Sequence, residues 1–331
     1  MAEGAAFVTG GSGFIGGRLI RRLVADGVDV RALARSERSA AAVEEAGATA
    51  VSGDLDDRDT MRAGAEGCEL AFHAAAHLGV WGKREDFERG NVIGTENVLG
   101  ACRDAAVRRF VHVGTEAALL AGEPLVNVDE TAPLRPDSKA LYASTKARAE
   151  QAVRSAAGDG FETVVVRPRF VWGTGDTTLL PGLVEAVKRG RFSWIDGGRH
   201  RTSTTHVENA VEGLVLGAER GRSGEAYFVT DGEPVVFRDI VTRLFESQAV
   251  TPPDKNAPRA MVAALAAAGE TAWRVLPLPG EPPVTRFAYW VAALETTIDI
   301  SKARSELGYA PVKSIDDGME ELRREEAAAP P

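Results

Sequence analysis

A glycine-rich turn near the N-terminus constrains the fold of this chain most strongly. Residues 7–16 read Phe-Val-Thr-Gly-Gly-Ser-Gly-Phe-Ile-Gly, between an apolar segment and a helical one. The first glycine permits a tight turn, the second leaves room for a pyrophosphate against the backbone, and the third permits close packing of helix on strand. The helix start then offers free N–H groups and a positive dipole end to phosphates. The turn predicts a dinucleotide site formed by Gly10, Gly13, Phe14, Ile15 and Gly16.

Short apolar segments alternate with amphipathic helical segments through the first half of the chain. The expected strands are Ala5–Thr9, Val28–Ala34, Ala48–Ser52, Leu70–Ala75, Phe110–Gly114 and Thr163–Arg167. Nearly continuous apolar strands between helices are typical of a parallel sheet covered on both faces. Because the crossover connections are right-handed, we predict an α/β fold, a doubly wound parallel (Rossmann) sheet. Its ligand crevice lies at the carboxyl ends of the strands.

The pattern becomes irregular after Pro168, where glycine and proline punctuate short helices. We therefore expect a dinucleotide-binding Rossmann domain over residues 1–168. A smaller, mixed substrate-binding lobe is expected over residues 169–331, with segments near 206–235 returning to the first domain.

Composition excludes several classes of protein. The net charge of −9 argues against a nucleic-acid partner, which would need a basic surface. The longest apolar run, Met261–Ala268, is far shorter than the ~20 residues of a membrane-spanning helix. No secretory signal is visible. Cys68 and Cys102 lack metal-like or redox-like spacing and are expected to be reduced thiols. We expect a cytoplasmic protein without a bound metal.

The end of the second predicted strand indicates which dinucleotide is bound. An NAD site usually has an acidic residue there, about 20 residues beyond the glycines, and this chain has Arg35 instead. The planar guanidinium of Arg35 suits a 2′-phosphate, whereas Arg31 points elsewhere by strand alternation. We predict NADP(H) as the preferred cofactor and NAD(H) as an acceptable one; stacking of Arg35 on adenine is the alternative. Asp54 is a candidate acceptor for the adenine amino group, or else a helix N-cap.

A tyrosine and a lysine form the candidate catalytic pair. Tyr142 and Lys146 lie one turn apart on one face of a predicted helix. Free tyrosine has a pKa of about 10, which an ammonium and a cationic nicotinamide ring would lower. Lys146 is also expected to hold the nicotinamide ribose, and Thr115, ending the fifth strand, to donate a hydrogen bond to a substrate carbonyl. Glu116 is a candidate second acid, or a salt-bridged or exposed carboxylate. Without the glycine turn, an ordinary amphipathic helix would be the better interpretation.

These residues resemble the extended short-chain dehydrogenase/reductases of the NAD-dependent epimerase/dehydratase superfamily. The closest likeness is to the 3β-hydroxysteroid dehydrogenase-like and sterol dehydrogenase-like branch. The marks are residues 9–16, 72–76, Asn91–Thr95, Tyr142–Lys146, Arg167–Pro168, 224–234 and 300–309. The resemblance implies that Thr115, Tyr142 and Lys146 are catalytic. One departure is Gly114 before Thr115, where the family usually has a second hydroxyl.

Further residues are implied by the resemblance together with the motifs. The cofactor set also includes Leu55, Ala74, Ala75, Ala76 and Arg167, and the substrate candidates are His77, Trp81, Glu116 and Trp172. A packed loop is the alternative for His77 and Trp81. Residues Met261–Pro283 are expected to be either a mobile apolar cover or an alanine-rich packing helix. Helices near 84–106 and 139–157 are expected to support a homodimer.

Three functions fit the sequence. The leading one is an NADP(H)-dependent oxidoreductase that interconverts a secondary alcohol and a ketone on a hydrophobic, for example steroid-like, substrate. The second is an epimerase or dehydratase that retains NAD and acts on a nucleotide sugar; a dehydratase needs an additional acid, for which Glu116 is the candidate. The third is a non-catalytic dinucleotide-binding protein, which would be expected to lack Tyr142 or Lys146.

Overall fold

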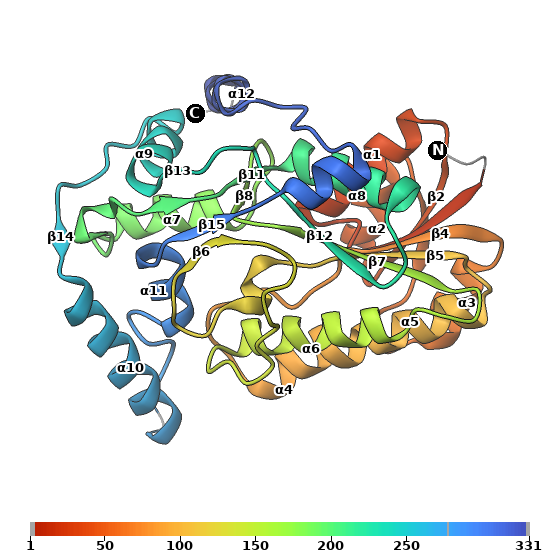
Figure 1. The fold of residues 1–331 in the computed structure, drawn as a ribbon, viewed down its shortest axis with the longest axis horizontal. Helices are drawn as coiled ribbons and strands as arrows, with labels where there is room; N and C mark the ends of the chain where they lie inside the picture. Colours follow the sequence, from red (N-terminus) through yellow and green to blue (C-terminus); the bar gives the residue numbers. More distant parts are fainter. Residues whose placement is uncertain (1–3, 277, 329–331) are drawn as a thin grey trace.

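A seven-stranded parallel sheet forms the centre of the molecule (Figure 1). The computed structural model describes residues 4–276 and 278–328. The strand order is β12-β7-β5-β4-β1-β2-β3. Their bounds are β1 Ala5–Thr9, β2 Asp29–Ala34, β3 Thr49–Ser52, β4 Cys68–His73, β5 Arg109–Val113, β7 Glu162–Pro168 and β12 Glu225–Val229. The predicted α/β, doubly wound fold class is therefore confirmed.

Helices cover both faces of this sheet because alternate strand residues point to opposite sides. Ala6 and Val8 belong to one core cluster and Phe7, between them, to the other. The first cluster lies under α1 (Phe14–Ala25), α2 (Glu37–Glu45) and α8 (Val207–Arg220). The second lies under α3 (Arg58–Ala65), α5 (Gly94–Asp104) and α6 (Leu141–Ser155). Figure 1 shows α1 and α8 above the sheet and α3, α5 and α6 below it.

The smaller lobe is built, in the part of the chain that the structure describes, on short strands and five helices. A mixed sheet has the order β13-β10-β15-β6. Its strands are β13 Val235–Val236, β10 Arg201–Thr202, β15 Thr296–Ile298 and β6 Leu125–Val128. Two further pairs are β8 (Val171–Trp172) with β11 (Thr205–His206) and β9 (Trp194–Ile195) with β14 (Asn256–Ala257). The helices are α7 Leu179–Lys188, α9 Phe237–Ser247, α10 Arg259–Val275, α11 Arg286–Ala293 and α12 Ile315–Ala328.

Short helical turns complete the fold near the site. The predicted long helix at 84–106 is divided into α4 (Arg84–Phe87), a π-helix η1 (Glu88–Ile93) and α5. A 3-10 turn, η2 (Glu116–Leu119), follows β5 directly. The others are η3 (Asp196–Gly198) and a π-helix η4 (Ala303–Leu307).

The chain crosses between the two parts in both directions. Residues 207–229, which form α8 and β12, return to the large sheet, where β12 pairs with β7. In the other direction, β6 lies within the first 168 residues of the sequence but pairs with β15 of the smaller lobe. Each part of the sequence therefore contributes a strand to the sheet of the other part. The candidate site lies where the two parts meet, at the carboxyl edge of the large sheet.

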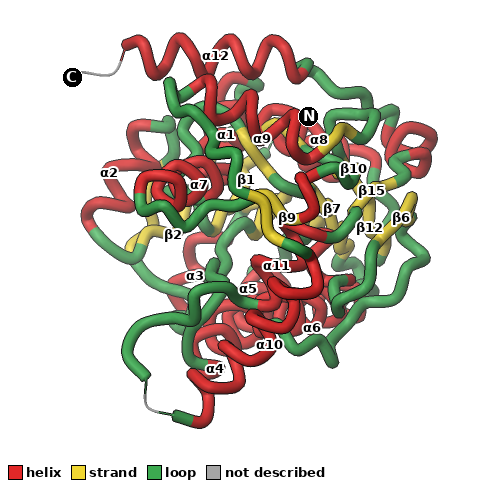
Figure 2. The backbone as a smooth tube through the Cα atoms, turned by 90° about the vertical axis from the view of Figure 1, so that its left-hand side faces the viewer, coloured by secondary structure: helices red, strands yellow, loops and turns green. Residues whose placement is uncertain are grey.

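Helices α10 and α12 lie at opposite edges of the molecule (Figure 2). Helix α10 contains the apolar run Met261–Ala268. In the part of the chain that the structure describes, no helix is both long and apolar enough to cross a bilayer.

Candidate active site

The glycine turn has the tight geometry that a pyrophosphate requires. Gly10 has a φ of +75°, and the Gly13 N–H donates to its carbonyl oxygen at 3.0 Å. A Cβ on Gly10 would lie 2.4 Å from the Ala75 nitrogen, and one on Gly16 would lie 2.2 Å from the Gly10 oxygen. Gly13 begins α1 without a capping side chain, so the N–H groups of the first turn, at Phe14 and beyond, are open to a ligand. The turn fits a dinucleotide phosphate.

The end of β4 lies against this turn. The Ala74 N–H donates to the Thr9 oxygen at 3.0 Å, and Ala74, Ala75 and Ala76 are all partly exposed. Small side chains here leave the backbone accessible beside the turn. Ile15, in the first turn of α1, packs against the core.

Arg35 and Arg31 have different surroundings at β2. Arg31 donates to the carbonyl oxygens of Gly64 (3.3 Å) and Glu66 (2.8 Å), so it points toward α3, as strand alternation predicts. Arg35 is exposed at the end of β2, and no other described residue forms a hydrogen bond or ion pair with its side chain. Its five N–H donors are thus available to a ligand.

Asp54 does not cap a helix, so that alternative was wrong. Its Oδ1 accepts the Asp56 N–H at 2.8 Å, whereas α3 is capped by Asp57. Asp54 is exposed and follows β3 on the same edge as Arg35. The next residue, Leu55, is partly buried, and its carbonyl oxygen accepts from Asn97 at 2.9 Å. Asp54 therefore remains available to a ligand.

The structure brings Thr115, Tyr142 and Lys146 together. Thr115 follows β5 and immediately precedes η2, which packs against α6, the helix that carries Tyr142 and Lys146. Burial raises the pKa of Tyr142, the Glu116 charge raises it further, and the Thr115 hydroxyl lowers it. The tyrosine is thus held protonated at neutral pH, as an acid rather than a base.

Lys146 lies one turn deeper, where it is almost completely buried. Its Nζ donates to the Val113 oxygen at 2.9 Å and lies 3.2 Å from Nε2 of His112. Burial lowers the pKa of Lys146 to about 8, and the charge of Glu150 opposes this shift. The ammonium therefore keeps most of its charge near neutral pH.

Two buried ion pairs lie behind these catalytic candidates. Arg167 donates to Glu150, with Nε at 3.0 and 3.1 Å from the two carboxylate oxygens, and both side chains are fully buried. The prediction that Arg167 binds the cofactor was therefore wrong. Arg169 pairs with Glu116 at 2.6 Å, Nη1 to Oε1. Glu116 is thus the salt-bridged carboxylate of the two alternatives, not a free acid.

A buried polar network joins the carboxyl ends of β1 and β4 to α5. Nδ1 of His73 lies 2.6 Å from the Thr9 hydroxyl and Nε2 lies 3.0 Å from the Thr95 hydroxyl. Burial, followed by the Lys146 charge, lowers the pKa of His73 to about 3, so the imidazole is neutral. No sequence signal reveals this long-range arrangement.

Asn91 fastens the loop after β4 to α6. Its Oδ1 accepts the His77 N–H at 2.7 Å, and its Nδ2 donates to the Thr145 hydroxyl at 3.0 Å. The His77 ring stands edge-on to Phe87 at 4.6 Å between centroids. His77 is thus held in a packed loop, although its side chain is partly exposed.

Aromatic residues close the outer end of the site. Phe287, on α11, stands edge-on to Tyr142 at 5.3 Å between ring centroids. Trp81 lies under the Arg274 guanidinium of α10, 5.6 Å from its ring centroid. Sequence reasoning missed Phe287, since nothing in its neighbourhood predicts a contact with Tyr142. Within the proposed cover Met261–Pro283, residue 277 lies outside the described residues.

Trp172 was wrongly expected to contact substrate. Its side chain is fully buried in the core of the lobe, its Nε1 donates to Asp231 at 2.8 Å, and its ring stands edge-on to His206. It therefore stabilises the lobe rather than lining the crevice.

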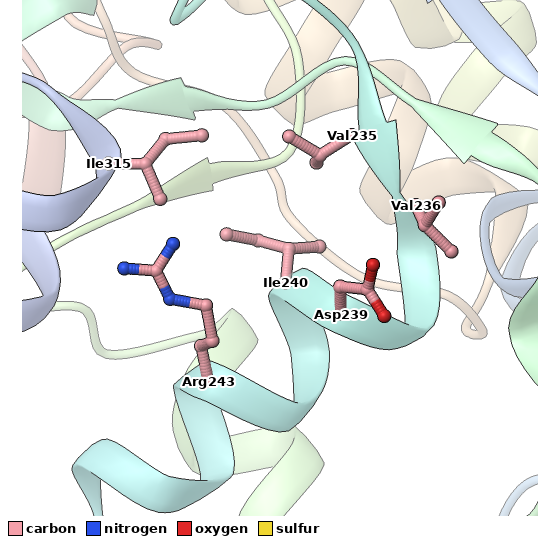
Figure 3. A pocket seen from close by; sticks show the side chains of 6 residues that line it. All are labelled: Val235, Val236, Asp239, Ile240, Arg243 and Ile315. Carbon is pink, nitrogen blue, oxygen red and sulfur yellow. The ribbon is translucent and has the colours of Figure 1, made fainter.

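A surface hollow of about 320 Å³ lies away from these residues (Figure 3). It is lined by Val235, Val236, Asp239, Ile240, Arg243 and Ile315. Arg243 is paired with the exposed Asp316, and none of the catalytic candidates reaches the hollow. Within residues 4–276 and 278–328, no three metal-ligating side chains gather in one place.

Comparisons with known proteins agree with this architecture. Residues 7–258 match the family model of the 3-beta hydroxysteroid dehydrogenase/isomerase family. The chain is 48% identical to the 4-hydroxy-2-methyl-3-oxo-4-farnesyl-3,4-dihydroquinoline-1-oxide ketoreductase of Stigmatella aurantiaca, covering 96% of this chain and 95% of that protein. It is 36% identical to the 2-alkyl-3-oxoalkanoate reductase of Stenotrophomonas maltophilia (strain K279a), covering 97% and 99%.

Solved structures share the fold. The structure of gox2253 matches with a TM-score of 0.80 at 27% identity, covering 97% of this chain and 98% of that one. A sugar-nucleotide dehydratase and an epimerase, both solved with NAD, match at 23% and 18% identity, which establishes the fold alone. The fold and site define an extended short-chain dehydrogenase/reductase, an oxidoreductase that uses a nicotinamide dinucleotide. Within this class, the chain belongs to the 3-beta hydroxysteroid dehydrogenase/isomerase family.

Proposed function

We propose that this protein is an NADP(H)-dependent oxidoreductase that interconverts a secondary alcohol and a ketone on a hydrophobic small molecule. The observation that carries the proposal is the position of Thr115, at the start of the η2 turn that packs against α6, the helix on which Tyr142 and Lys146 lie one turn apart. This cluster lies at the same edge of the sheet as the glycine turn. The names of the two relatives, a ketoreductase and an oxoalkanoate reductase, support ketone reduction.

Each residue has a distinct task in the proposed reaction. The nicotinamide supplies or accepts the hydride. Tyr142 donates its proton to the ketone oxygen in reduction and takes a proton from the alcohol in oxidation. The Lys146 cation, one turn away, stabilises the phenolate that this transfer leaves. Phe287 excludes water from the outer side of the phenol.

Replacement of the tyrosine tests the assignment. We expect Tyr142→Phe to lose about 10²–10⁴-fold in kcat, the usual contribution of a general acid, and to bind NADPH as the wild type does. NADPH oxidation is measured across a panel of steroid, aromatic and aliphatic ketones, and NADPH binding by fluorescence. Full activity in this variant would refute the proposal.

The preference for NADP(H) rests on Arg35, which is exposed and unpaired where a 2′-phosphate is expected. A hydrogen bond to a charged group contributes about 1.5–3 kcal/mol, so Arg35→Ala is expected to lower kcat/KM for NADPH about 10–100-fold. The value for NADH should change little. Arg31→Ala is the matched control, because that side chain points to α3. Equal losses in kcat/KM with NADPH and NADH would show that Arg35 does not bind the 2′-phosphate.

The pairing of Glu116 argues against the dehydratase alternative. A dehydratase would need an additional free acid, and Glu116 is paired with Arg169 instead. An epimerase retains its cofactor, so NAD that co-purifies with the protein would favour this alternative. A non-catalytic dinucleotide-binding protein would be expected to lack Tyr142 or Lys146, and both are present. NADPH binding without turnover of any ketone would favour this alternative.

Three further proposals concern the surroundings of the site. The α10 segment, whose Arg274 reaches Trp81, would act as a cover that opens for substrate. Helices α5 and α6, packed side by side, would form a homodimer contact, which light scattering can measure. A reducing, cytoplasmic location is consistent with Cys68 and Cys102, which are both buried and unpaired.

A further inference from the structure

Two buried histidines lie side by side on neighbouring strands of the large sheet. His73 on β4 pairs with His112 on β5, and their ring centroids are 5.2 Å apart. They are 0% and 1% exposed. Both ring nitrogens of His73 have a partner, the hydroxyls of Thr9 and Thr95. His112 differs, because its Nε2 lies 3.2 Å from Nζ of Lys146 while no described residue is hydrogen-bonded to its Nδ1.

The direction of the hydrogen bond between Lys146 and His112 follows from the charges of the two groups. Burial, followed by the Lys146 charge, holds the pKa of His112 well below its usual value, so the imidazole is neutral. Burial lowers the pKa of Lys146 only to about 8, so the ammonium keeps most of its charge. An ammonium has three N–H donors and no acceptor. Nε2 of His112 is therefore the acceptor, and the hydrogen of the neutral ring lies on Nδ1.

The Nδ1 of His112 is an unusual group for the middle of a sheet. His112 lies between His73 of β4 and Val165 of β7, with Val111 and Val113 as its buried neighbours along β5. A buried N–H without a partner destabilises a folded protein, and an apolar ring at this position would avoid that penalty. Packing alone therefore gives no reason for a histidine here, whereas the bond with Lys146 does.

The bond with His112 also fixes the rotation of the Lys146 ammonium. One N–H donates to the Val113 oxygen at 2.9 Å and a second donates to Nε2 of His112. The N–H bonds of an ammonium are tetrahedral, so two fixed acceptors determine the direction of the third. No other described residue accepts from Nζ, and the third N–H is thus the one left for a ligand.

We propose that His112 is a positioning residue, which accepts one N–H of Lys146 through Nε2 and thereby directs the remaining N–H toward the ribose of the cofactor. The inference rests on the proposed function, because it concerns how Lys146 meets the cofactor and Tyr142. It follows that the ammonium is oriented by β5 before any cofactor binds. A hydrogen bond to the charged form favours that form, so His112 also helps to keep the cation that stabilises the Tyr142 phenolate.

The other titratable groups around Lys146 come from several elements. Glu150 on α6 opposes the effect of burial on the Lys146 pKa, and Arg167 on β7 is paired with Glu150. His73 on β4 is neutral, with a pKa of about 3. Tyr142, one turn earlier on α6, is protonated at neutral pH because burial raises its pKa. These groups stay in place when the imidazole acceptor is removed, so its removal is expected to lower the pKa of Lys146.

The tautomer of His112 is the first test, measured on the wild-type protein without cofactor. ¹⁵N NMR distinguishes a protonated ring nitrogen from a bare one, and the signal missing in His112→Gln identifies the residue. We expect a hydrogen on Nδ1 and none on Nε2 at neutral pH. A hydrogen on Nε2 would overturn the proposal, because that nitrogen could not then accept from Lys146.

The ionisation of Lys146 is the second test, followed by NMR of ¹³Cε-labelled lysine, with Lys146→Met to assign its signal. We expect His112→Phe to lower the midpoint by about 1–2 pH units, since a hydrogen bond to a charged group is lost. His112→Gln keeps an acceptor in Oε1 and should recover most of this shift. His73→Phe is the matched control: it removes a buried, neutral imidazole that is bonded to threonines instead, and should leave the midpoint unchanged.

An unchanged midpoint in His112→Phe, or an equal fall in His73→Phe, would overturn the proposal. The affinity for NADPH should fall in His112→Phe and recover in His112→Gln, and an unchanged affinity in His112→Phe would refute the role of the third N–H. Thermal unfolding identifies any variant that fails to fold, and His112→Leu then replaces His112→Phe. The NMR measurements need no turnover. If the wild type reduces no ketone, the proposed function fails, while the lysine titration still decides the role of His112.

Discussion

Two buried ion pairs lie beside the catalytic candidates, and the same charges have opposite consequences in them. Arg167 at the end of β7 and Arg169 just beyond it each hold one carboxylate. Glu150 lies one turn beyond Lys146 and raises the pKa of that ammonium, so it supports the charged form. Glu116 raises the pKa of Tyr142, so it opposes the charged form. The effect of a buried carboxylate therefore depends on which catalytic group it reaches.

The pairs also differ in what else they touch. The Glu150–Arg167 pair is fully enclosed, and the Arg167 guanidinium lies 5.0 Å from the Phe228 ring centroid. The Glu116–Arg169 pair extends by hydrogen bonds to Thr115 and to Thr202 of the lobe. We infer that the first pair mainly fixes α6 against β7, whereas the second connects the Thr115 hydroxyl to the smaller lobe.

The largest effect that separates the pairs should be on stability. Arg167→Met leaves Glu150 buried and unpaired, which typically costs about 3–5 kcal/mol in the free energy of unfolding. Urea unfolding measures the loss. The matched control, Arg167→Met with Glu150→Leu, removes both charges and is expected to recover most of it. If Arg167→Met alone is as stable as the wild type, Arg167 is not the partner that Glu150 needs.

A smaller effect is expected on pH dependence. The same Glu→Gln substitution in the two ion pairs should shift the pH profile of alcohol oxidation in opposite directions. Glu150→Gln removes support for the Lys146 charge, so its pKa falls below about 8 and the phenolate of Tyr142 loses a cation. The pH at which alcohol oxidation rises should then move up, whereas Glu116→Gln moves it down. Each shift is expected to be about one pH unit, or about 1.4 kcal/mol.

The measurement is kcat against pH for the two variants and the wild type. NADP⁺ binding and thermal unfolding serve as controls for folding. Shifts in the same direction would mean that the two carboxylates act through general charge rather than through separate catalytic groups.

The features predicted from sequence are those carried by short stretches of chain. The turn at residues 7–16 and the spacing of Tyr142 and Lys146 are local, because strand, turn and helix geometry fix them over a few residues. They predicted the fold class and the meeting of Tyr142, Lys146 and Thr115 at one edge of the sheet.

The features that sequence could not predict depend on distant pairs. Arg169 and Glu116 are 53 positions apart, and no periodicity links them. Arg167 belongs to a motif, yet its buried partner Glu150 decides its role, so the expected contact with cofactor was wrong. Trp172 was misplaced for the same reason: its partner Asp231 lies in another loop.

The strand exchange at β6 has a consequence for how the chain folds as it is made. The Asn127 N–H donates to the Thr297 hydroxyl, across 170 positions, beside the pairing of β6 with β15. The large sheet likewise lacks its edge strand β12 until residue 229 has been synthesised. Domains usually fold from the N-terminus while synthesis continues. Strand β6 therefore stays unpaired until residues 296–298 have left the ribosome.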